Sequence, residues 1–309
     1  MKTVFADFNA MTEAGDLRLE LNGSTRDRRE QNIKIGDWVW LSDGELFVGA
    51  LVRADEQEGV VGTPRWRTLV HLDDDDAKDY SRIAIQLNRI QSQPSLDVDA
   101  AAQSFRLLTI LGSLDAPEGV PRIPRGVFHY CRAVDLSLLD EPQLALVEIV
   151  AARNGQSGNP YYDLTYLDIL SRVSPALAAE VSLTLAADPN ATAKVLAACI
   201  NVRSQLTLFG SDQRFETAGQ EILGWIGRFD RLPDRGDVPA SIVALVYLVR
   251  GLVLLRSGRR DEAHHVLRIA QQIDPSNPSI AESVGLESFD DQARDIVARL
   301  RDRASLHAA

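Results

Sequence analysis

The chain has 309 residues, of which 45% are hydrophobic and 25% charged, and its formal net charge is −11. These proportions are typical of a soluble globular protein, and they exclude a wholly disordered, fibrous or multispan membrane protein. The acidic balance argues against nucleic-acid binding, which normally uses a basic face. A chain of this length predicts two domains, and it needs no disulfide or metal for stability because it can bury about 75% of its unfolded surface.

The cysteines and the N-terminus indicate a cytoplasmic protein. Cys131 and Cys199 lie in apolar stretches and are predicted to be small buried hydrophobic residues rather than a disulfide framework. No signal peptide is expected, because the first residues contain no long apolar run. The longest apolar stretch, 238–255, contains Pro239 and Arg250 and is not predicted to span a membrane. The 33 basic residues include only four lysines, a bias that indicates GC-rich bacterial coding.

Residues 1–93 are predicted to form a small β-rich domain. Residues 16–21 alternate polar and apolar side chains and place three leucines on one face of a strand. Asp43 and Gly44 form a strong hairpin signal. The segment 83–87 fits either a last strand or a short helix, and both alternatives stay open. Further strands are predicted at 38–42, 45–52, 59–61 and 69–72.

The order of these strands resembles SH3-type barrels through a Gly-Asp-x-Val turn, a hairpin and a Val-Gly-Ala strand. The likeness is short and implies no function. It predicts an SH3-like barrel or a strongly bent sheet.

From residue 94 to residue 309 the apolar spacing becomes helical and no strand signal interrupts it. The predicted fold class is therefore α+β, a β-rich domain followed by an all-α domain of helix hairpins stacked in sequence. Residues 73–96, which include an aspartate run at 73–76, are the expected connection. Helices are predicted at 98–114, 123–139, 142–153, 161–173, 175–187, 191–208, 214–229, 239–257, 260–273, 278–286 and 289–304.

One hairpin, at about 240–277, carries a family resemblance. The hairpin resembles the tetratricopeptide repeat in the spacing of six residues. They are an aromatic residue and a close-packing glycine in the first helix, three apolar residues in the second helix and a closing proline: Tyr247, Gly251, Ala263, Leu267, Ala270 and Pro275. Gly258 stands at the turn between the helices. Arg250 replaces the family's leucine, and no second clear copy is found. The alternative is an ordinary helix hairpin in an all-α domain.

The resemblance implies a role for the first helix of this hairpin, which in the family lines a groove that holds peptides. The corresponding side chains here are mostly aliphatic: Leu245, Leu248, Val249, Leu252, Leu255 and Arg256. This helix is apolar nearly all round, so it packs either against the protein's own hairpins or against a hydrophobic partner segment. The family's clamp for a C-terminal carboxylate is absent.

Two aromatic pairs are further candidates for partner contact. Tyr161 and Tyr162 follow Pro160 at the start of a predicted helix, where they are either core residues or interface anchors. Trp38 and Trp40 are two residues apart on a strand and therefore share a face. That face is either a core layer or a platform of the kind that small barrels present to peptides.

No catalytic, cofactor or metal site is predicted. The five histidines show no ligand spacing, and the four contiguous aspartates of residues 73–76 are expected to form a solvated loop. Residues 155–159 approach a nucleophile elbow but lack its final glycine and its preceding strand.

The sequence predicts a non-catalytic interaction or adaptor protein that binds a protein or peptide, with a basic partner favoured by the net charge. The alternative is an enzyme or small-ligand sensor with a pocket between the two domains, since the 44 acidic residues allow many carboxylate pairs.

Overall fold

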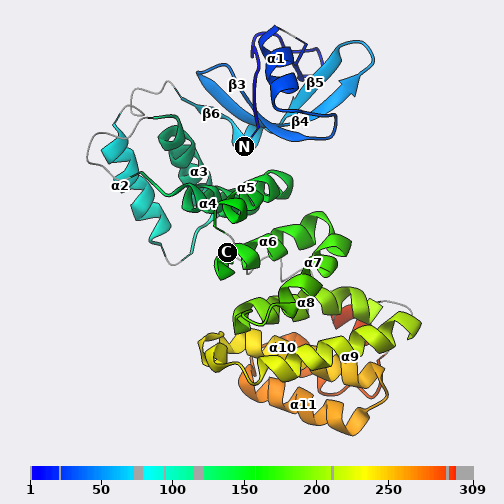
Figure 1. Ribbon diagram of the computed structural model, residues 1–309. Coiled ribbons are helices and arrows are strands. Elements are labelled where there is room, and N and C mark those ends of the chain that lie inside the picture. The colour runs from blue at the N-terminus through cyan, green and yellow to red at the C-terminus, as the bar shows by residue number, and fades with distance from the viewer. Residues whose placement is uncertain are drawn as a thin grey trace. The chain divides into compact units, whose positions relative to one another are not determined.

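The computed structural model confirms the α+β class, with a curled mixed sheet followed by helices (Figure 1). The chain divides into two compact units, one ending at Ser157 and the other beginning at Gly158. The predicted boundary at residues 93 and 94 lies inside the first unit and stays a prediction about folding. The structure describes residues 2–20, 22–72, 79–93, 95–114, 122–156, 158–209, 212–289 and 292–296.

The sheet of the N-terminal unit has the order β1-β3-β4-β5-β2, and β6 also pairs with β4. β1 runs parallel to β3, and the other pairs are antiparallel. The predicted strands are present, although the one expected at 16–21 is reduced to two residues. The strands are β1 (Thr3–Phe5), β2 (Leu17–Arg18), β3 (Trp38–Ser42), β4 (Leu46–Asp55), β5 (Gly59–Pro64) and β6 (Val70–His71).

Strand β1 and helix α1 (Asn22–Glu30) were not predicted. The α1 sequence contains no large apolar residue, so it shows no hydrophobic periodicity. Polar contacts hold it against β1 instead. The Ser24 hydroxyl donates to the carbonyl of Phe5 over 2.6 Å, and the side chain of Gln31 bonds both the amide and the carbonyl of Thr3.

Strands β3 and β4 are buried on both faces at their centres. Val39 and Leu41 point into the core of the sheet with residues of β4 and β2. On the opposite face Trp40 is paired with Gly49 and has no exposed surface. A Cβ atom on Gly49 would lie 2.4 Å from Cδ1 of Leu144, so β4 and helix α5 (Pro142–Gly155) approach each other closely. The outer face of β3 and β4 is therefore covered by helices of the same unit.

The helical part of this unit consists of α2 (Tyr80–Gln91), α3 (Val98–Ser113), α4 (Arg125–Leu138) and α5, and each helix contacts the next. The segment 83–87 is helical, which settles the open alternative. The buried residues of α2 follow the helical period, at Tyr80, Ile83, Leu87 and Ile90. Asp97 caps α3 by accepting a hydrogen bond from the amide of Ala100 over 2.8 Å.

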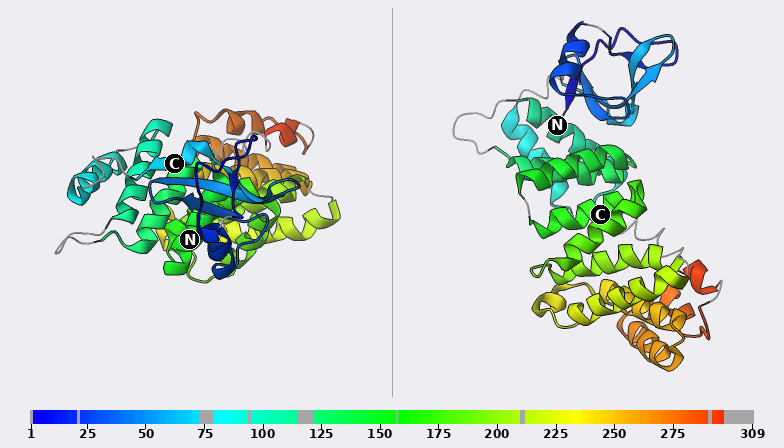
Figure 2. Two further views of the ribbon diagram at one scale, coloured as in Figure 1. Left: turned by 90° about the horizontal axis from the view of Figure 1, so that it is seen from above. Right: turned by 45° about the vertical axis from the view of Figure 1, so that its right-hand side comes forward.

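All the regular secondary structure in the described residues of the C-terminal unit is helical, with bounds within a few residues of those predicted (Figure 2). Several helices begin with proline in the first turn, where its missing N–H costs nothing. The helices are α6 (Pro160–Val173), α7 (Pro175–Ala187), α8 (Ala193–Phe209), α9 (Asp212–Phe229), α10 (Ala240–Arg256), α11 (Arg260–Ile273) and α12 (Pro278–Ser283). The helix predicted at 289–304 is described at Phe289, which lies in a bend, and at 292–296, which are helical.

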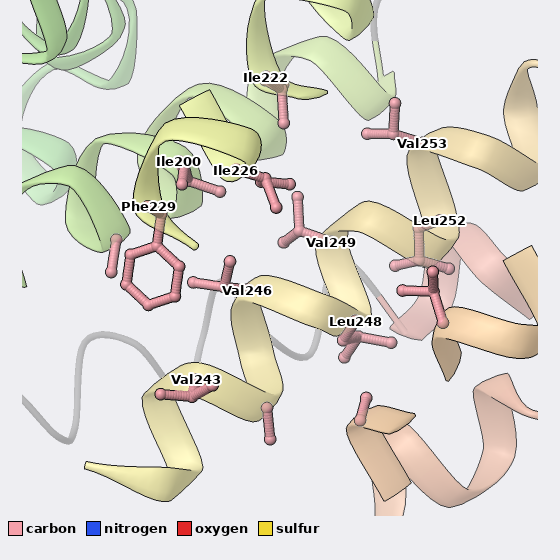
Figure 3. Close-up of a cluster of buried hydrophobic side chains, with 14 of the residues drawn as sticks. Ile200, Ile222, Ile226, Phe229, Val243, Val246, Leu248, Val249, Leu252 and Val253 are labelled. Carbon is pink, nitrogen blue, oxygen red and sulfur yellow. The ribbon is translucent and has the colours of Figure 1, made fainter. Parts of the chain in front are cut away.

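These helices pair as hairpins, and the first helices of successive hairpins contact one another. Helix α8 contacts α6 and α10 as well as its neighbours α7 and α9, and α10 contacts α12 as well as α11. As a result α10 is buried on almost every side: ten of its residues are buried, and nine of these belong to the hydrophobic core of which Figure 3 shows a part.

Helices α10 and α11 cross closely at the two small residues that the sequence singled out. Gly251 and Ala263 are both buried, and a Cβ atom on Gly251 would lie 2.5 Å from Cγ of Leu267. Gly258 lies in the turn between the helices, with a φ of 75° that favours glycine.

Leucine at position 263 is expected to lower the free energy of unfolding by about 1–3 kcal/mol, because three extra carbons enter a filled crossing. Urea unfolding of the full chain measures this loss. Ala176 is exposed at the start of α7, so Ala176→Leu is the matched control and is expected to leave stability nearly unchanged. An Ala263→Leu variant as stable as the control would contradict the close crossing.

Candidate functional site

The structure places the predicted groove residues of α10 mostly inside the C-terminal unit. Leu248 and Leu252 have no exposed surface, and Leu245 is half-buried against the same core. In this arrangement Leu248 and Leu252 offer no surface to a partner, because their neighbours are the chain's own helices (Figure 3).

Arg256 is engaged at the end of α8. Its Nη1 donates to the carbonyl oxygens of Thr207, over 3.0 Å, and of Leu208. Its guanidinium carbon lies 4.3 Å from the centroid of the Phe215 ring and 5.5 Å from that of Phe289. A cation at this place satisfies carbonyls that a helix C-terminus leaves unpaired.

The tyrosine pair is divided between surface and core. Tyr161 is 59% exposed, whereas its neighbour Tyr162 is buried. Asn159 caps α6 by accepting a hydrogen bond from the amide of Tyr161 over 3.0 Å. Of the ten residues predicted to contact a partner, Tyr161 has the largest exposed fraction.

The two tryptophans share a face, as expected, but that face does not form an open platform. Trp38 is half-buried, and the guanidinium carbon of Arg65 lies 5.1 Å from its ring centroid. Arg65 also pairs with Glu141, its Nε lying 3.6 Å from Oε2. Trp40 is fully buried and stacks on Phe47 at a centroid distance of 4.8 Å.

A cluster of buried polar groups meets Trp40 from the helices. Glu148 on α5 accepts a hydrogen bond from Nε1 of Trp40 over 3.0 Å, and its other oxygen lies 2.7 Å from Nδ1 of His129. Nη2 of Arg132 lies 3.4 Å from Oε1 of the same carboxylate. One carboxylate therefore joins strand β3 to two side chains of α4.

Arg132 is enclosed by aromatic rings. Its guanidinium carbon lies 4.6 Å from the ring centroid of Trp40, 4.9 Å from that of Phe105 and 5.4 Å from that of Phe128. Negative ring faces stabilise a cation that has left water. Its Nε has no hydrogen-bond partner among the residues that the structure describes.

Asp135 extends the cluster toward α3 and α2. Burial raises the pKa of its carboxyl to about 7, although a hydrogen bond with Ser104 and the charge of Arg132 act in the opposite direction. Ser104 in turn accepts from Nε2 of Gln91 over 3.4 Å. Oδ2 of Asp135 has no hydrogen-bond partner in the described part of the chain.

The two carboxylates of the cluster thus differ in charge. Burial alone would raise the pKa of Glu148, but the Arg132 charge and the contacts of His129 and Trp40 outweigh it and lower that pKa. Glu148 is ionised at neutral pH, while Asp135 is close to the midpoint of its titration. We call Gln91, Ser104, His129, Arg132, Asp135, Glu148 and Trp40 the polar cluster.

Most of this cluster was not predicted from the sequence. One signal was present, since Glu148 interrupts the apolar stripe of α5 that contains Leu144, Ile149 and Ala152. A charged residue inside such a stripe indicates a buried partner. The position of that partner on another helix and on a strand was not predictable from spacing.

The part of the polar cluster that consists of Trp40, Glu148, His129 and Arg132 lies between β3 and helices α4 and α5, close to where the alternative interpretation placed a pocket. The side chains of Glu148 and Arg132 are 0% and 2% exposed. A dissolved substrate has no access to them in this arrangement.

Other candidate chemistry can be located as well. The aspartates at 73–76 lie outside the described residues, and the described residues contain no group of acidic, histidine and cysteine side chains that could hold a metal ion. Gly155 ends α5 and Pro160 begins α6, so the near match to a nucleophile elbow lies between two helices. Burial raises the pKa of Cys131 to about 11 and that of Cys199 to about 12, which leaves both thiols protonated at neutral pH.

None of the helices described here has the length and apolar character needed to cross a membrane. No protein family, curated protein or solved structure matches this sequence.

Proposed function

We propose that the protein is a non-catalytic adaptor of the bacterial cytoplasm that binds another protein through its C-terminal helix hairpins, of which the hairpin at about 240–277 resembles a tetratricopeptide repeat. The observation that supports this proposal is the packing of α6, α8 and α10, the first helices of three successive hairpins, against one another. Hairpins stacked in this way bury their faces on their neighbours and leave extended surfaces, which repeat proteins use for binding.

Tyr161 is the anchor that this proposal favours. The residue is 59% exposed on α6, the first helix of the stack. An exposed tyrosine supplies a large contact area at a low cost in side-chain entropy, and interface hot spots are enriched in tyrosine.

A basic partner fits the charge of the chain. The net charge of −11 attracts a positively charged protein and raises the rate of encounter. Lasting affinity then depends on apolar anchors such as Tyr161, because long-range attraction is screened by salt.

Affinity capture with the full chain tests the proposal through Tyr161. Tyr161→Ala is expected to weaken binding of the captured protein about tenfold or more. Trp66 is 45% exposed in the N-terminal unit, so Trp66→Ala is the matched aromatic control and is expected to bind like the wild type. A captured protein that binds the Tyr161→Ala variant as tightly as the wild type would contradict the role of Tyr161. Failure to capture any specific protein would contradict the adaptor proposal itself.

A further inference from the structure

The polar cluster has an unequal number of buried positive and negative groups. Arg132 is its one permanent cation, and the carboxylate of Glu148 already pairs with it at 3.4 Å. Asp135 is only 1% exposed, and its Oδ2 has no hydrogen-bond partner within the described residues, so the attraction of the Arg132 charge does not offset its burial. When Asp135 loses its proton, a second negative charge is therefore buried against one cation, and this is costly.

The groups that face Asp135 come from every helix around it. Helix α4 contributes Arg132 and Cys131, and the Cys131 sulfur lies 3.7 Å from Oε1 of Gln91 on α2. Helix α3 contributes Ser104. Beyond Arg132, Glu148 and His129 connect the cluster to Trp40 on β3. A change in the charge of Asp135 therefore alters the interactions of side chains that connect α2, α3, α4, α5 and the sheet.

We propose that the polar cluster is a proton-sensitive lock within the N-terminal unit, in which protonated Asp135 keeps α3 and α4 closed on the sheet and its deprotonation loosens that packing. The lock is independent of the proposed binding function, which depends on α6–α12. It gives the unit two states that differ by one proton.

The direction of the pH effect follows from the two titrations of Asp135. The carboxyl has a pKa of about 7 when the unit is closed and about 4 when it is opened to water. The closed state therefore holds its proton more tightly. The stability of the closed state relative to the open state declines as the pH rises from about 4 to about 7. Between pH 5.5 and pH 8 the opening equilibrium is expected to increase on the order of 30-fold.

Hydrogen–deuterium exchange of the full chain tests the lock. Protection factors, corrected for the intrinsic effect of pH on exchange, are expected to fall on the order of 30-fold in α3, α4 and β3 between pH 5.5 and pH 8. Asp135→Asn keeps the shape of a protonated carboxyl and is expected to abolish this fall. Asp99→Asn, at an exposed site on α3, is the matched control and should behave like the wild type.

A second variant keeps the test decisive if Asp135→Asn does not fold. The hydrogen bond with Ser104 lowers the pKa of Asp135, so Ser104→Ala is expected to move the fall in protection to higher pH. The lock would be overturned if the wild type had equal protection factors at both pH values. It would also be overturned if the fall in protection persisted in Asp135→Asn, or if the pH midpoint of that fall were unchanged in Ser104→Ala.

Discussion

Replacing Glu148 by alanine is expected to lower the free energy of unfolding of the N-terminal unit by about 3–5 kcal/mol, because it leaves the buried charge of Arg132 without its carboxylate. The same change removes the acceptor of the Trp40 indole N–H and the contact of His129. Urea unfolding followed by tryptophan fluorescence measures the loss. A Trp225→Phe background confines the signal to the N-terminal unit, since the other three tryptophans lie there.

Two further variants separate loss of the charge pair from loss of packing. The double variant Arg132→Met with Glu148→Leu is expected to recover the part of the loss that comes from the unpaired charge of Arg132, but not the part that comes from Trp40 and His129, which still lack their carboxylate partner. Glu58 pairs with Arg18 at the surface, its Oε2 lying 2.6 Å from Nε, and Glu58→Ala should cost far less. A Glu148→Ala variant that unfolds like the wild type would show that the polar cluster adds nothing to stability.

Replacing Leu252 by alanine is expected to cost the C-terminal unit about 2–5 kcal/mol, since the side chain has no exposed surface and its removal leaves a cavity. Hydrogen exchange of α10 and α11 as a function of urea measures this loss. Ile242 lies on the same helix and is 39% exposed, so Ile242→Ala is the control and should cost much less. If Leu252→Ala lowered the free energy of unfolding as little as the control does, the result would favour the other interpretation of α10, a groove open to a hydrophobic partner.

Much of the fold was predictable because its hydrophobic pattern is strong. The strands around Trp38 and Leu46 follow from a hairpin signal between apolar runs, and the helices from breaks at proline and glycine. Helix α1 was missed because hydrogen bonds of Ser24 and Gln31, not apolar residues, attach it to β1. The segment 83–87 was ambiguous because so short an apolar run fits both periods.

The candidate site was less predictable than the fold. Sequence spacing correctly gave Trp38 and Trp40 a common face, but it did not show that α4 and α5 cover that face. Burial depends on tertiary packing between segments about a hundred residues apart, as in the hydrogen bond from Trp40 to Glu148. Helical spacing favours the core for Tyr162, and Tyr162 is buried while its neighbour Tyr161 is exposed.

We expect the sheet and helices α3–α5, which lie in one compact unit, to unfold cooperatively because Glu148 joins them. Native-state hydrogen exchange of the full chain at increasing urea tests it most directly. Residues 38–52 and 125–155 are expected to open together, with one free energy and one urea dependence, separately from residues 160–273. A sheet that opens at its own free energy while α4 and α5 stay protected would contradict the claim, and it would support a folding boundary at residues 93 and 94.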